Sequence, residues 1–405
     1  MHVHATRRCT DNEVDELLDT LLAALDDELP AARSLREQLH ASPDLSWQEE
    51  ATAASVAQAL GGATVRRVCG TGLVAAVGHA AAPGIGVRAE LDGLPIEESS
   101  GAPFAATNGA MHGCGHDVHT AALTALVRAA RRLEPELPAP LVALFQPSEE
   151  AYPSGAQRLL EEGALEGLDS VVAVHVHPLV AWGAATSDGG PVNASSDNFR
   201  ILIEGAGGHA AYPHRARDPI VALTQTVVAL QQLVSRRIDP MDSAVVSVGW
   251  IRGGTAENVI APEAEAGGTL RVLRPDAREF LRMEIANVSE YTAAAAGCRA
   301  TVEFTHGEPA IVNDEAAASA ARGLLERAGF ATSESLRSCG SDDVGFFGVA
   351  ARLLVVFVGV AGAPGGSDAP LHHPAFLPPT EAVDAVARAQ AAAYVAAAGT
   401  LPLSQ

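Results

Sequence analysis

An unbroken apolar run, Leu141-Val-Ala-Leu-Phe145, leads directly into Gln146-Pro-Ser-Glu-Glu150. A run of this length beside turn-forming residues is typical of a strand buried on both faces. Similar runs occur at 84–92 and 171–176, and the helical patterns between these strands lie at 119–133 and 154–163. Strands that alternate with helices predict an α/β domain with a largely parallel sheet.

The middle of the chain follows a different pattern. Its periodicities predict the order strand, helix, strand, strand, helix, strand, at 198–204, 219–236, 243–250, 263–273, 277–295 and 299–305. That order is typical of the ferredoxin-like arrangement, and the α/β pattern resumes after it. A chain of 405 residues is also long for a single core. We therefore predict an α/β catalytic domain in two segments, 1–189 and 307–405, with an α+β domain inserted at 190–306.

Composition excludes several kinds of partner. The 27 basic and 49 acidic residues give a formal net charge of −22, which nucleic acid and anionic membranes repel. No apolar run reaches the roughly 20 residues of a membrane span, and no secretory leader is visible. The five cysteines are scattered and odd in number, unlike a disulfide framework. We therefore expect a cytoplasmic protein that binds neither nucleic acid nor membrane.

Cysteine and histidine gather in the stretch Met111-His-Gly-Cys-Gly-His-Asp-Val-His-Thr120. Cys114 and His116 flank a glycine, so both side chains can turn toward one point, and a thiolate with an imidazole suits a borderline transition metal. A packed cysteine beside capping histidines is the plain alternative. A cysteine nucleophile with a histidine base is a third interpretation, but it leaves the later histidines and acidic pair without a role.

Two adjacent carboxylates, Glu149 and Glu150, follow the strand predicted at 141–145. The carboxyl ends of such strands are where α/β sheets bind ligands. Adjacent side chains point in different directions, so one carboxylate can bind metal while the other moves protons. A solvated surface pair is the commoner explanation for any two adjacent glutamates, and the position after a strand favours the first interpretation.

Histidines stand at two further strand ends. His175 ends the strand predicted at 171–176, and His372 follows the last strand. Asp92 closes the strand at 84–92, where it can accept a hydrogen bond from a ligand imidazole. A cysteine, several histidines and a carboxylate predict a site for zinc, manganese or cobalt.

The inserted domain carries polar groups of its own. His209 lies in a glycine-rich stretch, where the backbone can approach another surface closely. Together with Asn258 and Arg271, it could hold an oxyanion and a substrate carboxylate. For Arg271, an ordinary surface position on a strand is an equally good explanation.

These motifs, in this order, resemble the M20 metallopeptidase family. They are Cys-Gly-His-Asp-x-His-Thr, Gln-Pro-x-Glu-Glu, His-Val-x-Pro, Gly-Gly-His-Ala-Ala-x-Pro-His, Asn-Val-Ile and a late His-x-Pro, and the likeness spans 39–374. Within the family the chain is most similar to the amidohydrolase branch of hippurate hydrolases, N-acyl-amino-acid deacylases and indoleacetyl-amino-acid hydrolases. Two positions depart from that branch, with Glu90 in place of aspartate and Asp342-Asp343 in place of Glu-Asp.

The resemblance implies a set of roles. Two divalent ions would be held by five ligands, namely Cys114, His116, Glu150, His175 and His372. Glu149 would be the general base, with Asp92 as its supporting carboxylate. His209 would polarise the scissile carbonyl, in such enzymes from the partner subunit of a dimer, and Asn258 and Arg271 would bind substrate.

The implied activity is hydrolysis of the amide bond of an N-acyl amino acid or a similar small conjugate, by a homodimer formed through the inserted domain. A dipeptidase, a carboxypeptidase or an N-carbamoyl hydrolase would use the same residues. A binding protein on a retired hydrolase scaffold is the non-enzymatic alternative. The presence of Glu149, which binding alone does not need, argues against it.

Overall fold

A computed structural model describes residues 10–79 and 82–401 of the chain. The described residues form two compact units. The first comprises the chain up to Gly190, Val312–Leu336 and the chain from Phe346 on, and the second comprises Pro191–Ile311 and Arg337–Gly345. Sequence analysis assigned 337–345 to the catalytic segment. They belong instead to the second unit, because Ser338 forms a β-bridge with Asn193 and Arg271 donates a hydrogen bond to Ser341.

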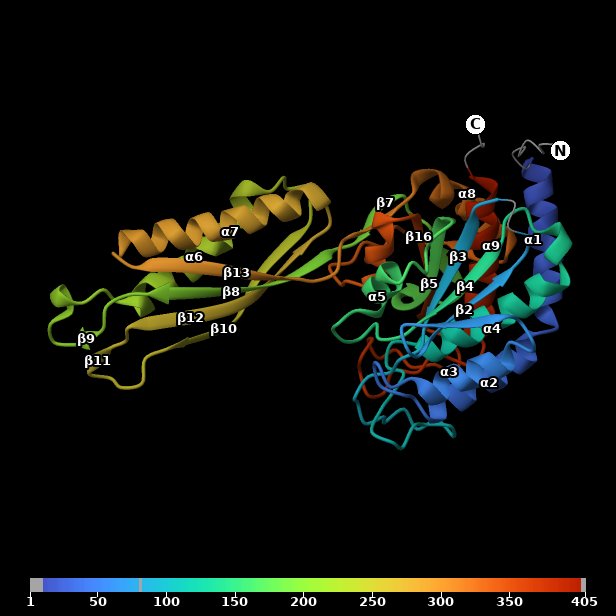
Figure 1. Cartoon of the computed structure of the whole chain (residues 1–405), viewed down its shortest axis with the longest axis horizontal. Coiled ribbons are helices and arrows are strands. Elements are labelled where there is room, and N and C mark those ends of the chain that lie inside the picture. Colours follow the sequence, from blue (N-terminus) through green and yellow to red (C-terminus); the bar gives the residue numbers. More distant parts are fainter. Residues whose placement is uncertain (1–9, 80–81, 402–405) are drawn as a thin grey trace. The chain divides into compact units, whose positions relative to one another are not determined.

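The first unit is built on one mixed sheet (Figure 1). Its strands run in the order β1-β2-β4-β3-β5-β16-β14, with β6 beside β16 and β15 beside β6. Their bounds are β1 Val65–Val68, β2 Gly72–Val77, β3 Gly84–Glu90, β4 Leu141–Gln146, β5 Leu168–Ala181, β6 Ala184–Thr186, β14 Ile311–Asn313, β15 Ala331–Thr332 and β16 Arg352–Ala361. The four neighbours β4, β3, β5 and β16 are mutually parallel. This confirms the predicted largely parallel sheet.

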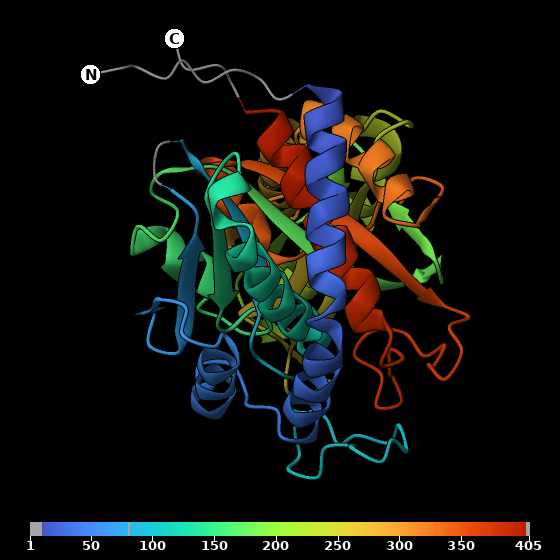
Figure 2. The same cartoon turned by 90° about the vertical axis from the view of Figure 1, so that its right-hand side faces the viewer.

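Helices cover this sheet. They are α1 Asp11–Asp26, α2 Leu29–Ala41, α3 Glu50–Ala59, α4 His116–Arg132, α5 Gly155–Glu161, α8 Glu315–Arg327 and α9 Ala382–Gly399. The alanine-rich α9 is buried along most of its length, because α1, α4 and α8 pack against it on one side and β5 and β16 on the other. Figure 2 shows α1 in blue, α4 in teal and α9 in red within this helical layer. Small alanine side chains let the helices pack closely.

The second unit is a four-stranded antiparallel sheet with two long helices against it. The strands β10 (Ala244–Gly253), β12 (Glu263–Val272), β8 (Ser195–Glu204) and β13 (Arg299–His306) lie in that order, and the helices are α6 (Pro219–Arg237) and α7 (Pro275–Ala295). The order of elements along the chain confirms the predicted ferredoxin-like arrangement. The short strands β9 Gly208–His209 and β11 Val259–Ile260 pair with each other, whereas β7 Gly190–Asn193 is the last strand of the large mixed sheet, next to β14. The 3₁₀ turns of the chain lie at Glu134–Glu136, Pro213–Arg215 and Asp343–Val349.

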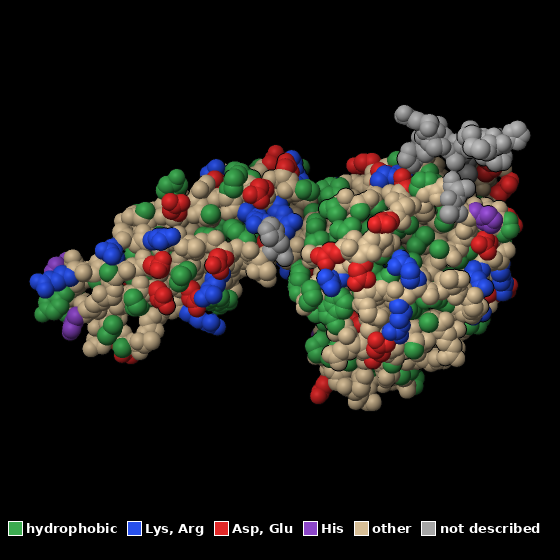
Figure 3. Space-filling view, in the orientation of Figure 1, with side chains coloured by type: hydrophobic (Ala, Val, Ile, Leu, Met, Phe, Trp, Pro, Cys, Tyr) green, Lys and Arg blue, Asp and Glu red, His purple; other side chains and the backbone are tan. Residues whose placement is uncertain are grey.

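The surface carries charges of both signs. On the face shown in Figure 3, acidic and basic side chains are interspersed over each unit. None of the helices in the described residues combines the length and apolar character that a bilayer span requires.

A buried ion network anchors the start of α4 to α2. The Asp117 carboxylate accepts hydrogen bonds from Arg36 and His40, at 2.7 and 2.8 Å, and all three side chains are buried. Burial alone would lower the pKa of His40, but the charge of Asp117 raises it. Burial would likewise raise the pKa of Asp117, but Arg36 and His40 lower it. Each charge in the network is therefore stabilised by its partners.

We expect Asp117→Asn to lower the free energy of unfolding by about 3–5 kcal/mol, because it removes the carboxylate that pairs with the buried Arg36 and leaves His40 with Glu98 as its remaining acidic partner. The contribution of Asp117 is present above its ordinary pKa of 3.8 and is lost as pH falls through its lowered folded value. That of His40 is present below its ordinary pKa of 6.5 and is lost as pH rises through its raised folded value. In urea unfolding, the loss in free energy of unfolding of Asp117→Asn relative to wild type should therefore be larger at about pH 6 than at about pH 9.

The control for this experiment is Asp19→Asn, which breaks an exposed ion pair with Arg327. Exposed pairs contribute about 0–1 kcal/mol, so this variant should unfold nearly as wild type does. An Asp117→Asn variant as stable as the Asp19→Asn variant at both pH values would contradict the role of the network.

Candidate metal centre

The parallel strands bring the predicted ligands together at one edge of the sheet. The neighbours β4, β3, β5 and β16 all run in one direction, so their carboxyl ends meet at the same edge. Asp92 follows β3, Glu149 and Glu150 follow β4, and His372 lies in the loop after β16.

Residues 114–116 enter the same edge from the start of α4. Sequence analysis placed the helix start at 119, but α4 begins at His116 because Gly115 adopts the left-handed conformation, with φ +83°, at its N-cap. A Cβ on Gly115 would lie 2.5 Å from Val176 Cγ2, a distance that side chains do not tolerate. Glycine is therefore required for Cys114 and His116 to lie against β5.

His175 stands within β5 and not at its end. Sequence analysis ended this strand at 176, two residues before Pro178, and proline usually interrupts strand hydrogen bonding. The strand continues to Ala181 past an irregularity in the pairing with β16, between Gly359 and Ala361. The irregularity accommodates the proline.

The candidate ligand atoms form two overlapping sets. One set joins Cys114 to His116 and His175, the other joins Cys114 to Glu150 and His372, and within each set the atoms lie within 4.8 Å of one another. In the first, Cys114 Sγ lies 3.5 Å from His175 Nε2. In the second, His372 Nε2 lies 3.3 Å from Glu150 Oε1. The thiol is common to both sets.

Hydrogen bonds fix which imidazole nitrogen faces the sets. His116 Nδ1 lies 2.9 Å from the Asp92 backbone carbonyl, and His175 Nδ1 lies 2.6 Å from the Val176 carbonyl. A carbonyl only accepts, so each Nδ1 carries a proton, and Nε2 is the nitrogen left to bind a metal. The Asp92 carboxylate, predicted to receive the ligand imidazole, is 3.6 Å from His116 Nδ1. It accepts instead from the Ser46 hydroxyl and the Glu150 amide, at 2.7 and 3.0 Å.

The donor set fits a divalent cation. Among the described residues, His116 Nε2 and Glu150 Oε1 are buried polar atoms without a hydrogen-bond partner. In native proteins, buried polar atoms nearly always have a partner. Burial alone would lower the pKa of His116, but neighbouring carboxylates, above all Glu90 and Asp92, raise it to about 10. The cluster therefore attracts positive charge. A bound metal would displace the second proton of the His116 ring, the one on Nε2.

Glu149 lies beside this cluster. Its side chain is 13% exposed, and its Oε2 lies 3.8 Å from His116 Nε2. Among the candidates this carboxylate combines closeness to the ligand atoms with access to solvent. It is therefore placed to exchange a proton with a molecule bound there.

Two buried side chains support the centre, His119, to which sequence analysis gave no role, and Glu90, which it named only as a departure from the amidohydrolase branch. His119 accepts the Val176 amide proton at Nε2, 3.0 Å away, and its Nδ1 lies 2.8 Å from Glu90 Oε2. The other Glu90 oxygen pairs with Arg88. Glu90, His119 and His175 are also close enough to hold an ion, but both nitrogens of His119 are already engaged. The i, i+3 spacing from His116 to His119 could have signalled this shared helix face.

The predicted residues of the second unit fall into two places. Val259, the residue after Asn258, pairs with His209, and the Asn258 carbonyl accepts the Ala210 amide proton at 3.0 Å. Arg271 lies near the other end of β12 and donates to Ser341 Oγ at 2.8 Å. It stands eight residues after the first residue of β12, Glu263, or about 26 Å along an extended strand. His209 pairs with β11, which ends just before Glu263, so His209 and Arg271 lie toward opposite ends of β12 in this unit.

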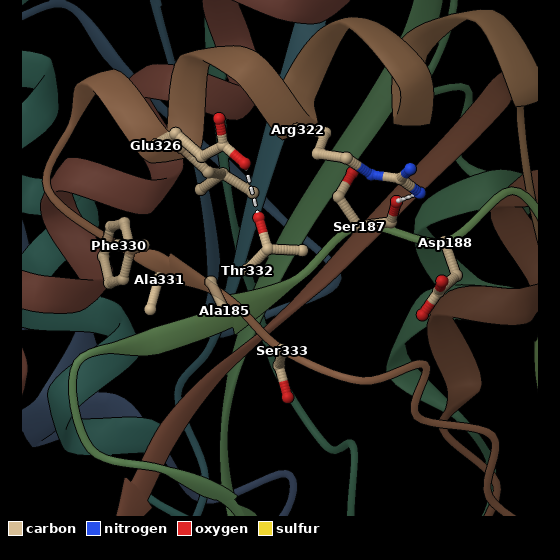
Figure 4. A pocket seen from close by; sticks show the side chains of 10 residues that line it. Ala185, Ser187, Asp188, Arg322, Glu326, Phe330, Ala331, Thr332 and Ser333 are labelled. Carbon is tan, nitrogen blue, oxygen red and sulfur yellow. Dashed lines mark hydrogen bonds between the residues drawn. The ribbon is translucent and has the colours of Figure 1, made fainter.

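A separate pocket of the first unit is shown in Figure 4. It has a volume of about 170 Å³ and lies between β6, β15 and α8, where Arg322, Glu326 and Ser187 are among its lining residues. No cysteine or histidine lines it. It is therefore distinct from the candidate metal centre.

Known proteins resemble the chain over most of its length. The profile of peptidase family M20/M25/M40 matches residues 86–396. The N-acetyl-L-cysteine deacetylase of Bacillus subtilis (strain 168) is 36% identical over 347 residues, 84% of this chain and 82% of that protein. The N-acyl-L-amino acid amidohydrolase of Geobacillus stearothermophilus is 35% identical over 283 residues, 69% of this chain and 76% of that protein. A solved Bacillus subtilis structure, described as a dinuclear metal-binding peptidase from the M20 family, superposes with a TM-score of 0.80 at 30% identity and covers 91% of this chain and 98% of that chain.

Proposed function

The chain belongs to peptidase family M20/M25/M40, and we propose that it hydrolyses the amide bond between an acyl group and an amino acid in a small N-acyl amino acid. The observation that carries the proposal is the gathering of Cys114, Glu150 and three histidines at one sheet edge, with Glu149 beside them. Two relatives whose names specify N-acetylcysteine and N-acyl-amino-acid substrates support the substrate class.

Two divalent ions are the cofactors. We propose the five predicted ligands as their protein donors, with Cys114 shared, because both sets of ligand atoms contain its sulfur. When bound, the ions supply Lewis acidity to the site. Zinc, manganese and cobalt all suit a thiolate, imidazoles and a carboxylate, so the preferred metal is an outcome of the experiment below.

The residues of this chain would divide the remaining work. Glu149 takes the proton of the attacking water and returns it to the leaving amine. Asp92 holds the backbone of Glu150 through its amide. His209 would stabilise the developing oxyanion, and Asn258 and Arg271 would bind the amino-acid part of a substrate.

We expect N-acetyl and N-benzoyl amino acids to be hydrolysed with kcat/KM on the order of 10⁴ M⁻¹ s⁻¹ or above, the ordinary enzymatic range. The measurement uses protein reconstituted in turn with zinc, manganese and cobalt, assayed by release of the free amino acid. N-Carbamoyl amino acids and dipeptides complete the panel. EDTA should abolish all turnover.

The panel separates the alternatives. A preference for dipeptides would replace the proposal with a peptidase, and a preference for N-carbamoyl compounds would replace it with a ureido hydrolase. Absence of turnover with every metal would favour a binding protein.

We further propose a homodimer formed through the second unit. The strand β10 is at one edge of the four-stranded sheet, and Trp250 and Ile251 on it are 38% and 49% exposed. The helix α6 exposes Val221 and Val228. An open edge with apolar neighbours is a surface that a second strand can cover. A partner subunit could also bring its own copy of the His209 region to a substrate that the local Arg271 binds. A monomer mass in sedimentation analysis would overturn this proposal.

The cytoplasmic location stays a prediction, which cell fractionation tests.

A further inference from the structure

Three residues with strained backbones surround one buried carboxylate in the first unit. Among the described residues, four that are not glycine have positive φ, namely Trp47, Cys69, Ser148 and His372. Glu49 Oε1 accepts the amide protons of Trp47 and Ser148, both at 2.8 Å. Its Oε2 accepts the Thr71 hydroxyl at 2.7 Å, directly after the turn at Cys69. Positive φ is sterically unfavourable for these residue types and persists only where the surroundings enforce it.

The hydrogen bonds of Glu49 show that its carboxylate acts as an acceptor. Backbone amides can only donate, so the Oε1 that receives both must accept. The residue is completely buried. Burial raises the pKa of Glu49, while the donors around it act in the opposite direction. Within the described part of the chain, the carboxylate is therefore held by hydrogen-bond donors and by no ion pair.

Ser148 immediately precedes Glu149. Its φ is +46°, and its carbonyl accepts the Gly155 amide at 2.8 Å. A Cβ on Gly155 would lie 1.6 Å from the Pro147 carbonyl oxygen, so the turn closes too tightly for any side chain there. The direction in which the chain leaves Ser148 sets the direction of Glu149.

The segment 46–49 contacts this turn directly at two points and a third time through Asp92. Besides Glu49 on Ser148, the Trp47 indole donates to the Pro153 carbonyl at 2.9 Å. Ser46 donates to the Asp92 carboxylate, which in turn accepts the Glu150 amide. The two direct contacts join residues 99 and 106 positions apart in the sequence, and the contact through Asp92 joins residues 46 positions apart. We call residues 46–49 the brace.

We infer that Glu49 is a positioning residue, which through Ser148 holds Glu149 in the orientation needed for proton transfer. This inference rests on the proposed function in assigning the base to Glu149. Glu49 contacts none of the candidate ligand side chains in any hydrogen bond described above. Its loss should therefore affect the chemical step more than metal binding.

The test compares Glu49→Ala and the milder Glu49→Gln with wild type, all loaded with metal. A misplacement of about 1 Å can cost about 10²-fold in rate, so we expect kcat of Glu49→Ala to fall by about that factor while KM and metal content per subunit stay near wild type. Glu49→Gln should fall less, because its amide oxygen can still accept from Ser148. Amide hydrogen exchange of residues 147–155 should be faster in both variants.

The matched control is Glu28→Ala. Glu28 is also a buried glutamate, but it pairs with Arg128 and Arg132 at the other end of α4 from His116. Its loss should lower stability without changing kcat or exchange at 147–155. A second comparison adds Ser148→Gly to Glu49→Gln, because glycine adopts positive φ without the steric penalty. Part of the lost kcat should return.

The outcomes separate this inference from the proposed function. Unchanged exchange at 147–155 in Glu49→Ala would overturn the brace, whatever the protein hydrolyses. Faster exchange with unchanged kcat would overturn the positioning role while leaving the brace a structural feature. Loss of metal together with kcat would assign Glu49 to the metal centre instead. Failure of the proposed function itself would appear separately, as activity retained when Glu149 is replaced.

Discussion

Replacing Glu149 with glutamine should lower kcat by about 10²–10⁴-fold, the contribution typical of a general acid–base residue. Glutamine has the same shape but cannot take up a proton. Metal content should remain at the wild-type level, because none of the five proposed ligands is altered. Steady-state kinetics and elemental analysis of the same preparation measure both quantities.

The neighbouring Glu150→Gln variant is the control. Glu150 Oε1 is buried and lies within reach of His372 and Cys114, so we expect this substitution to remove metal and activity together. Two adjacent glutamates would then give two distinguishable defects. Near-wild-type kcat in the Glu149 variant would refute its role as base.

The second large effect is expected at Cys114. Because its sulfur belongs to both ligand sets, Cys114→Ser should weaken the binding of both ions. Loss of residues that merely orient metal ligands typically costs about 10–100-fold in affinity, so loss of a shared ligand should cost at least about 100-fold. Titration of the metal-free protein followed by calorimetry measures this.

Cys69→Ser provides a matched control. Cys69 is also buried, and burial, with the nearby Glu162, raises the pKa of its thiol to about 12. This thiol is therefore neither a nucleophile nor a ligand near neutral pH, and its replacement should leave metal affinity unchanged. The experiment also decides the nucleophile alternative. A covalent acyl-enzyme detected by mass spectrometry in wild type, with normal metal affinity in Cys114→Ser, would support a cysteine nucleophile.

Local pattern was enough for most of the fold. Apolar runs bounded by turn residues predicted β3, β4 and the first part of β5, because a strand buried on both faces needs apolar side chains at every position. The predicted order of elements at 198–305 matches the second unit, since alternation and helical periodicity depend only on nearby residues. The residues proposed for the metal centre were also visible, because each belongs to a short motif at or near a strand end.

Other features depend on contacts between distant parts of the chain. The start of α4 is set by the closeness of Gly115 to Val176, and the continuation of β5 past Pro178 is set by its pairing with β16. Neither contact has a local sign in the sequence. The placement of 337–345 with the second unit follows likewise from pairing with Asn193.

The sequence by itself therefore determined the order of elements and the two-part architecture, and it supplied the candidates for metal binding. Only the tertiary structure decided how those residues are held. It shows which imidazole nitrogen is available, that Asp92 receives the Glu150 amide, and that Glu49 reaches across the chain to Ser148. The physical reason is that side-chain chemistry is written in residue type, whereas orientation arises from hydrogen bonds and close packing between segments that only folding brings together.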